Sequence, residues 1–175
     1  MGEIKKIAAK VGEAAALVPG IYSLWLEEID FVKDAVPGQF ISVYCEDKSR
    51  LLPRPISICE IDRKGGRLRI VYRTAGAGTM ELSRRKPGER VMVMGPLGNG
   101  YRMDVIKNQE EAHSLLIGGG IGIPPLLALA QALPGKKTAV LGYRDNQIFL
   151  KEEFLSCGCE IAIATDDGSV GTKGN

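Results

Sequence analysis

The sequence has little histidine, tryptophan or net charge. Its 175 residues include one histidine and one tryptophan, and 23 basic residues against 21 acidic ones leave a net charge of +2. So balanced a composition, without a block of five like charges, argues against a nucleic-acid-binding protein. The one histidine, His113, precedes an apolar stretch. We expect it to carry a charge or a hydrogen bond at a junction, because a histidine-dependent catalytic triad would have no other residue to use.

Cysteine is also scarce. The chain has 4 cysteines, but it is too long and too ordinary in composition to be a disulfide scaffold. Cys45 and Cys59 lie in apolar, strand-like segments, and we expect both to be buried. Cys157 and Cys159 are close in sequence, yet they lack the spacing and the neighbouring histidine of a zinc site. We therefore predict no metal ligands among the residues of this chain.

Long apolar segments are rare. Residues 114–135 carry no charge and would be long enough to span a bilayer. Four glycines within 118–122, followed by Pro124 and Pro125, would break a membrane helix in its middle. At the N-terminus, Glu13 interrupts the apolar part, which favours a first strand and turn over a signal peptide. We expect a soluble, cytoplasmic protein with no membrane segment.

Glycine, by contrast, is abundant. The chain has 22 glycines, nearly twice the usual share of about 7%. They follow no G-X-Y period and lie between apolar runs, which excludes collagen and argues against disorder. The excess predicts a backbone that turns sharply or approaches a ligand closely.

The apolar pattern changes near residue 103. The first part reads as short strands between turns, and 67–73 alternates polar and apolar residues, as a strand with one face on a core should. Strands at this spacing predict a closed antiparallel barrel over residues 1–102, with one short helix at 78–84. The predicted strands cover 21–28, 39–45, 55–61, 67–74 and 91–95.

The second part alternates strands with helices, which predicts a parallel α/β domain over residues 103–175. The polar stretch 101–112 reads as the linker before it. We expect strands at 114–117, 137–143 and 160–165, and helices at 124–133 and 146–155.

A glycine loop at 117–125 follows the first strand of this α/β part and opens its first helix. Such a loop lets the backbone approach a diphosphate at a helix N-terminus. It is neither the strict dinucleotide fingerprint, which would need glycine in place of Pro125, nor a P-loop. We interpret it as a nucleotide site, with tight strand–helix packing as the alternative.

A second cluster lies in the barrel. Arg54 and Ser57 open one predicted strand, and Tyr72 and Arg73 end another. Gly78-Thr79 then begins the short helix. Two guanidinium groups, which grip phosphates through paired hydrogen bonds, together with an aromatic ring suit a ligand with a flat ring and a diphosphate. Surface charge and ordinary turns are the alternative explanation.

The order of the motifs resembles the ferredoxin reductase superfamily and, within it, the electron-transfer subunits of bacterial type B dihydroorotate dehydrogenases. The resemblance covers essentially the whole chain and favours this subfamily through Gly-Ile-Pro-Pro-Leu after the glycines and through residues 165–174. The other motifs that carry it are Pro37-Gly38-Gln39-Phe40, Arg54-Pro55-Ile56-Ser57, Tyr72-Arg73, Gly78-Thr79, the stretch 95–100, and Gly118-Gly119-Gly120-Ile121-Gly122.

This resemblance implies a six-stranded Greek-key barrel that binds FAD, followed by an α/β domain that binds NAD(H). It also implies electron flow from NADH through FAD and a [2Fe–2S] cluster to the FMN of a dihydroorotate dehydrogenase catalytic subunit, within a heterotetramer of pyrimidine biosynthesis. By position, the FAD contacts would be Arg54, Pro55, Ile56, Ser57, Val71, Tyr72, Arg73, Gly78 and Thr79. The nicotinamide dinucleotide would meet Gly118, Gly119, Gly120, Ile121 and Gly122, with Asp166 and Asp167 nearby.

The chain departs from the family pattern in one respect. Family members carry a further segment with four closely spaced cysteines, and the cysteines of this chain do not match that spacing. We therefore expect a truncated nucleotide domain without the cluster. Two alternatives stay open: a subunit of another NAD(P)H-dependent enzyme, such as an NADP–ferredoxin oxidoreductase or a sulfhydrogenase, and a non-catalytic flavin-binding docking subunit. NAD is preferred over NADP by family analogy alone, because Arg144 could hold a 2′-phosphate.

Overall fold

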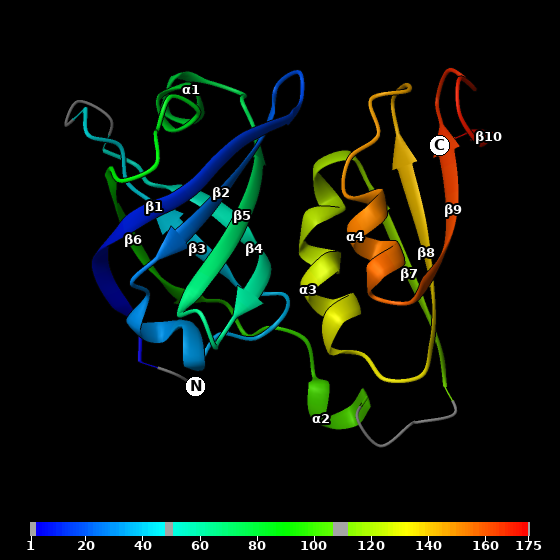
Figure 1. Ribbon diagram of the computed structural model, residues 1–175, viewed down its shortest axis with the longest axis horizontal. Helices are drawn as coiled ribbons and strands as arrows, with labels where there is room; N and C mark the ends of the chain where they lie inside the picture. Colours follow the sequence, from blue (N-terminus) through cyan, green and yellow to red (C-terminus); the bar gives the residue numbers. More distant parts are fainter. Residues whose placement is uncertain (1–2, 48–50, 107–111, 175) are drawn as a thin grey trace.

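The computed structural model describes residues 3–47, 51–106 and 112–174. It places a closed barrel beside a parallel sheet, and two helices lie between them (Figure 1). The barrel is built from the first half of the chain and the sheet from the second half. This architecture confirms the predicted antiparallel barrel followed by a parallel α/β unit.

The barrel closes in the strand order β1-β2-β5-β4-β3-β6. It forms because the strands alternate between a core face and an outer face. In β5, Leu68, Ile70 and Tyr72 point into the barrel core, while Val71 packs outward against the second half of the chain. The strands are β1 (Lys5–Val18), β2 (Ile21–Glu27), β3 (Phe40–Val43), β4 (Arg54–Asp62), β5 (Arg67–Arg73) and β6 (Arg90–Leu97).

Two short helices accompany the barrel. The first, η1 (Asp30–Lys33), buries Phe31 and Val32. The second, α1 (Ala77–Leu82), follows β5 and agrees with the predicted short helix. Sequence patterns did not indicate η1, because four residues are too few to show helical periodicity.

The second half forms a four-stranded sheet in the order β10-β9-β8-β7, with all neighbouring strands parallel. Its helices α3 and α4 lie on the side facing the barrel (Figure 1). The elements are α2 (Met103–Ile106), β7 (His113–Gly119), η2 (Gly120–Gly122), α3 (Pro124–Ala132), β8 (Lys136–Tyr143), α4 (Lys151–Ser156), β9 (Cys159–Thr165) and β10 (Thr172–Lys173).

Two expectations for this half need correction. The helix predicted at 146–155 begins only at Lys151, because Leu150 adopts a left-handed conformation with φ of 63°. Upstream of it, the Asp145 carboxylate accepts a hydrogen bond from the Gln147 N–H at 2.9 Å, a turn that competes with helix. The linker predicted at 101–112 contains α2, and residues 107–111 lie outside the described part of the chain.

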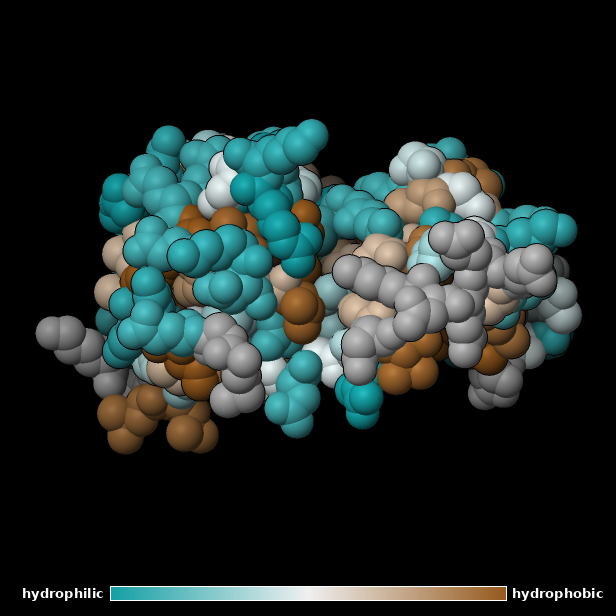
Figure 2. Space-filling model, turned by 90° about the horizontal axis from the view of Figure 1, so that it is seen from below, coloured by the Kyte–Doolittle hydropathy of each residue, from teal (hydrophilic) through white to brown (hydrophobic). Residues whose placement is uncertain are grey.

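The apolar segment 114–135 divides as predicted into a strand, a glycine turn and a helix. Its helix, α3, has 9 residues, and no helix in the described ranges is long and apolar enough to cross a membrane. On the sheet face away from α3, the β7 side chains of Leu115 and Ile117 are 60% and 68% exposed. Apolar surface is visible on this half of the molecule and along the rim of the barrel (Figure 2).

The barrel and the sheet share an apolar contact. Ile21, Cys59 and Val71 on the outside of the barrel belong to the same buried cluster as Leu127 of α3 and Phe154 of α4. Because this cluster joins side chains of both halves, the barrel and the α/β unit pack directly on one another.

The burial of the four cysteines predicts their order of reaction. Cys59 is buried as predicted, and Cys159 is buried too, whereas Cys45, which was predicted to be buried, is half-buried like Cys157; all four are free thiols. Burial raises the pKa values of Cys59, Cys157 and Cys159, which keeps the reactive thiolate rare. At pH 8 we expect a thiol reagent to label Cys45 first, Cys157 more slowly, and Cys59 and Cys159 only after unfolding. Peptide mass spectrometry measures the order, and labelling of native Cys59 as fast as Cys45 would contradict the described packing.

Candidate functional site

A groove of about 410 Å³ opens where the carboxyl ends of β7 and β8 face the end of β5. In open parallel sheets, ligands bind in the crevice outside the carboxyl ends of the strands. One wall of the groove comes from the barrel and the other from the α/β unit. Its lining is Val18, Pro19, Gly20, Ile21, Arg73, Thr74, Gly120, Tyr143, Arg144, Asp145, Gln147 and Phe149.

Arg73 and Gly120 meet across this groove. A Cβ atom placed on Gly120 would lie 3.3 Å from Nη2 of Arg73, so the guanidinium group reaches the glycine turn. Gly120 has a φ of 51°, a left-handed conformation that glycine adopts without strain. The structure therefore brings together one residue from each of the two clusters that the sequence singled out.

The other glycines of the loop divide between the two explanations that the sequence left open. A Cβ on Gly118 would lie 2.6 Å from Cδ1 of Leu126, so this glycine is needed for packing between β7 and α3. Around Gly122 no atom lies within 4 Å of such a Cβ, and at Gly119 the nearest lies 4.0 Å away. Gly118 thus serves packing, while Gly119 and Gly122 leave free space above the loop. Ile121 is 39% exposed beside them.

The second cluster lies at the start of β4. A Cβ on Gly78 would lie 2.5 Å from Nε of Arg54, which places the guanidinium group directly against the first turn of α1. Arg54 also donates to the backbone carbonyl of Leu52. Together, Arg54 and Gly78 line a small depression that also includes Tyr44 and Arg85. A guanidinium group held at the first turn of a helix is an arrangement that suits a phosphate.

Thr79 shapes this turn through its hydroxyl group. Its Oγ1 accepts hydrogen bonds from the N–H groups of Ala75 at 2.9 Å and Gly76 at 3.3 Å. The same hydroxyl donates to the carbonyl of Gly76 at 3.0 Å. Its hydrogen-bonding capacity is therefore engaged in holding the loop before α1.

The pleat of the strands separates the remaining predicted FAD contacts. Ile56 and Tyr72 are buried in the barrel core, while Pro55 and Ser57 are exposed on the outer face. Val71 is buried in the cluster shared with the α/β unit. Side chains that lie two apart share a face and adjacent ones do not, so these residues cannot all point at one ligand.

Tyr72 carries an unsatisfied polar atom. Its hydroxyl is buried and has no hydrogen-bond partner, and burial raises the pKa of the phenol. Its ring stacks on Tyr22 with centroids 6.2 Å apart. A buried hydroxyl without a partner costs stability unless a water or a ligand satisfies it.

Asp166 and Asp167 follow β9, at the same edge of the sheet as the glycine loop, and both are exposed. Neither lines the groove. Asp167 accepts a hydrogen bond from the Ser169 N–H at 2.9 Å, and bonding by Ser169 lowers the pKa of its carboxyl. The structure therefore places the two aspartates beside the groove and does not bring them into contact with Arg73 or Gly120.

The groove also contains residues that sequence reasoning did not select. Gly20, in the hairpin between β1 and β2, lines the barrel side. Tyr143 donates its hydroxyl hydrogen to the carbonyl of Phe149 at 2.7 Å and holds the loop after β8 against the groove. The first strand and turn were predicted, but no sequence signal places a hairpin of one half beside a loop of the other.

Among the described residues, no group of three or more His, Cys, Asp or Glu side chains could hold a metal ion. His113 instead shares a hydrogen bond of 2.8 Å with the hydroxyl of Thr138.

No family model matches the chain, but curated relatives do. The chain is 45% identical over 143 residues to the dihydroorotate dehydrogenase B (NAD(+)) electron transfer subunit of Geobacillus kaustophilus, covering 79% of this chain and 54% of that protein. It is 40% identical over 176 residues to the subunit of the same name from Lysinibacillus sphaericus, covering 98% of this chain and 67% of that protein. The chain belongs to this family of electron transfer subunits.

The chain thus spans between about half and two thirds of the length of these family members. A solved structure agrees on the fold. An NADH-dependent reduced ferredoxin-NADP oxidoreductase, described in connection with flavin-based electron bifurcation, superposes with a TM-score of 0.82 at 28% identity. The match covers 96% of this chain and 60% of that one. The family and the fold are those that the sequence motifs indicated.

Proposed function

We propose that the chain is the FAD- and NADH-binding part of a cytoplasmic electron transfer subunit, with residues 1–102 holding FAD and residues 103–175 receiving NADH. The observation that carries this proposal is the meeting of Arg73 with Gly120. Through this contact the end of β5, whose residues resemble a flavin-binding motif, lies directly against the glycine loop of the α/β unit. A hydride donor and a hydride acceptor bound on the two sides would share one groove.

The barrel residues fit FAD in two respects. Arg54 lies against Gly78, where a side chain on that glycine would displace the guanidinium group from a diphosphate position. Pro55, Ser57 and Arg73 are exposed on the outer face of β4 and β5, where a flat ring could lie. When bound, the flavin would supply two-electron chemistry on one side and single-electron chemistry on the other.

The α/β residues have a positioning role. Gly119 and Gly122 leave room for backbone approach, and Gly120 and Arg144 line the groove. Arg144 provides positive charge for the phosphates of the dinucleotide. The residues that line the groove are chiefly glycine, arginine and apolar side chains, and their part in hydride transfer would be to orient the donor and to exclude water.

We extend the proposal to a partner. The curated relatives are named as subunits of dihydroorotate dehydrogenase B, and we infer that electrons pass to an FMN-containing catalytic subunit in pyrimidine biosynthesis. The cysteines of this chain do not fit a [2Fe–2S] site, because no group of three or more His, Cys, Asp or Glu side chains lies together among the described residues, which include all four cysteines. A subunit of an NADP–ferredoxin oxidoreductase is the second candidate, supported by the solved structure of that activity at 28% identity.

The experiment combines spectra with reduction. The purified chain is titrated with FAD and then mixed with NADH or NADPH without oxygen. We expect a flavin spectrum that bleaches with NADH. A chain that does not bind FAD would overturn the proposal. If FAD binds but neither NADH nor NADPH reduces it, the result would favour a non-catalytic flavin-binding docking subunit. Adding the dihydroorotate dehydrogenase catalytic subunit or a ferredoxin as acceptor decides between the two candidate partners.

The buried Tyr72 hydroxyl, which has no hydrogen-bond partner, provides a further prediction. In Tyr72→Phe, we expect the free energy of unfolding without FAD to stay constant or to rise by about 1 kcal/mol, because a buried unsatisfied group is removed. If FAD satisfies that hydroxyl, its affinity should fall about 2- to 10-fold. Urea unfolding and FAD titration measure the two effects. A large loss of stability without FAD would show that the hydroxyl is satisfied within the chain.

A further inference from the structure

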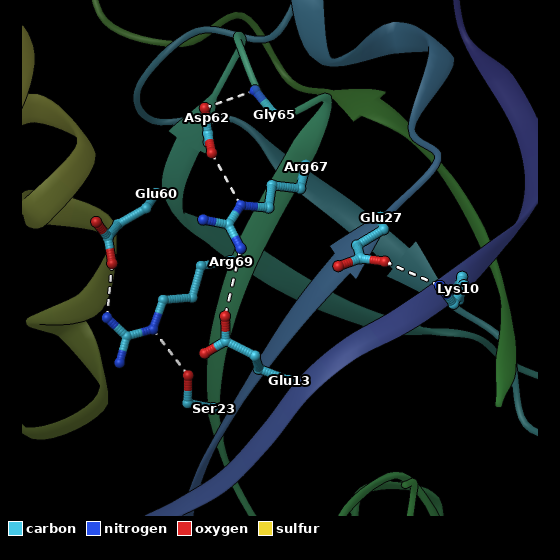
Figure 3. A network of polar contacts seen from close by, with 9 residues as sticks. All are labelled: Lys10, Glu13, Ser23, Glu27, Glu60, Asp62, Gly65, Arg67 and Arg69. Atoms are coloured by element: carbon cyan, nitrogen blue, oxygen red, sulfur yellow. Dashed lines mark hydrogen bonds and ion pairs between the residues drawn. The ribbon is translucent and has the colours of Figure 1, made fainter. Parts of the chain in front are cut away.

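A polar cluster links the barrel to both helices of the α/β unit. Nη1 of Arg69 donates to Glu60 at 2.6 Å, and its Nε donates to Ser23 at 2.8 Å (Figure 3). From α3, Nε2 of Gln131 donates to the other oxygen of Glu60 at 2.7 Å. From α4, Glu153 accepts from Nη1 of Arg69 at 3.4 Å. Glu60 and Arg69 thus each bond within the barrel and across to the α/β unit.

A neighbouring pair of barrel residues makes no such link. Arg67 bonds to Asp62 at 2.8 Å and to Glu13 at 3.3 Å, all within the barrel (Figure 3). Its side chain is 34% exposed, against 11% for Arg69, and Glu60 is only 15% exposed. The Arg69–Glu60 pair is therefore shielded from water, where a directed hydrogen bond is stronger than on the surface.

The neighbouring carboxylates stabilise the positive charge of Arg69. Burial acts to lower its pKa, but the hydrogen bond that Arg69 donates to Glu60 and the negative charges of Glu60 and Glu153 act to raise it, and the net shift is upward. The surrounding carboxylates therefore favour the charged form of the guanidinium group.

The cluster lies on the strand that reaches the groove. Arg69, Val71 and Arg73 share the outward face of β5, because side chains two apart point the same way. Arg69 and Arg73 are about 13 Å apart along the strand, at roughly 3.3 Å per residue. Between them, Val71 belongs to the apolar cluster shared with the α/β unit. One strand thus carries the polar link, the apolar contact and the arginine of the groove.

The two kinds of contact constrain the halves differently. Apolar burial holds surfaces together but is non-directional. Hydrogen bonds within a shielded network require defined donor and acceptor positions. We propose that Glu60 and Arg69, bound by Gln131 and Glu153, form a positioning latch that fixes the orientation of the barrel against α3 and α4, and through it the spacing between Arg73 and the glycine loop. The consequence for hydride transfer rests on the proposed function.

The test removes only the side chains that reach across. The double variant Gln131→Ala/Glu153→Ala leaves the barrel unchanged, and Gln131 is exposed on α3, so the fold should be retained. As a matched control, Glu13→Ala/Glu27→Ala removes two carboxylates that pair with Arg67 and Lys10 at 3.3 Å each, within the barrel. The rescue variant is Gln131→Lys combined with Glu153→Ala. Its lysine again offers Glu60 a hydrogen-bond donor from α3, now with a positive charge.

Three measurements are made on the full chain. Residual dipolar couplings of backbone amides report the orientation of the barrel relative to the sheet and need no cofactor. FAD titration reports the barrel site, and stopped-flow absorbance reports reduction of bound FAD by NADH. In the double variant we expect the couplings of the two halves to fit no common frame, FAD affinity to stay within twofold, and reduction to slow about 10-fold or more. The control should match the unchanged chain, and the rescue variant should recover both orientation and rate.

Three results would overturn the latch. One is a fixed orientation in the double variant, whatever its rate. Another is a double variant whose two halves lose their common orientation while FAD is still reduced at the unchanged rate. The third is a control variant that loses orientation and rate as much as the double variant does. If NADH does not reduce FAD in the unchanged chain, the proposed function fails, but the dipolar couplings still decide whether these side chains hold the two halves together.

Discussion

Replacing Arg54 with alanine is expected to weaken FAD binding about 10- to 100-fold. The guanidinium group lies against Gly78 at the first turn of α1, where it would bond to the diphosphate. Loss of a hydrogen bond to a charged group costs about 1.5–3 kcal/mol, which corresponds to this range. Isothermal titration of the chain with FAD measures the effect directly. Arg54→Lys should recover only part of the affinity, because an ammonium group keeps the charge but not the planar fork.

Two further variants make the Arg54 result specific. Arg90 donates to Glu28 at 2.7 Å on the exposed side of β6, so Arg90→Ala should leave FAD affinity within twofold. Gly78→Ala keeps the arginine but puts a methyl group 2.5 Å from its Nε, so it should weaken FAD binding by moving the guanidinium group. If Arg54→Ala binds FAD like the unchanged chain, the diphosphate lies elsewhere and the assignment of Arg54 and Gly78 to the diphosphate is wrong.

Apart from β10, whose two residues carry no pattern of their own, the strands of both halves were predictable because their signal is local. The alternation in β5 shows which side chains face the barrel core, and the uncharged stretch containing β7 and α3 divides at its glycines. The start of α4 was not predictable in this way. Helical periodicity across 146–155 is interrupted by a turn at Asp145 and by left-handed Leu150, whose conformation no propensity favours for leucine.

The sites were predictable as motifs but not as arrangements. The motif residues 54–57 and 71–73 were selected as a set, yet the pleat buries Ile56 and Tyr72 inside the barrel. The meeting of Arg73 with Gly120 joins two motifs from different halves of the chain, and the bond from Gln131 to Glu60 spans 71 positions. Contacts between distant residues depend on how the two halves pack, and a single sequence carries no periodic signal for that packing.

Closing the groove at the glycine loop should separate NADH oxidation from FAD binding. In Gly120→Val, the new side chain begins 3.3 Å from Nη2 of Arg73 and occupies the space where the two halves meet. We expect reduction of bound FAD by NADH to slow about 100-fold, because a displacement of about 1 Å between reacting groups can cost that much. FAD affinity should fall far less than the rate, because the new side chain can displace Arg73 but leaves Arg54 and α1 untouched. Anaerobic stopped-flow absorbance and FAD titration give the two values.

Backbone strain is the competing explanation for a slow Gly120→Val variant, and Gly158 controls for it. Gly120 and Gly158 both have positive φ, 51° and 76°, so valine costs about 1–2 kcal/mol of stability at either position. Around Gly158, between α4 and β9, nothing lies within 4 Å of an added Cβ, so Gly158→Val introduces the strain without filling the groove. We expect both variants to lose similar stability in urea unfolding and only Gly120→Val to lose the reaction with NADH. Equal rates in the two variants would show that the nucleotide does not use the space between Arg73 and the glycine loop.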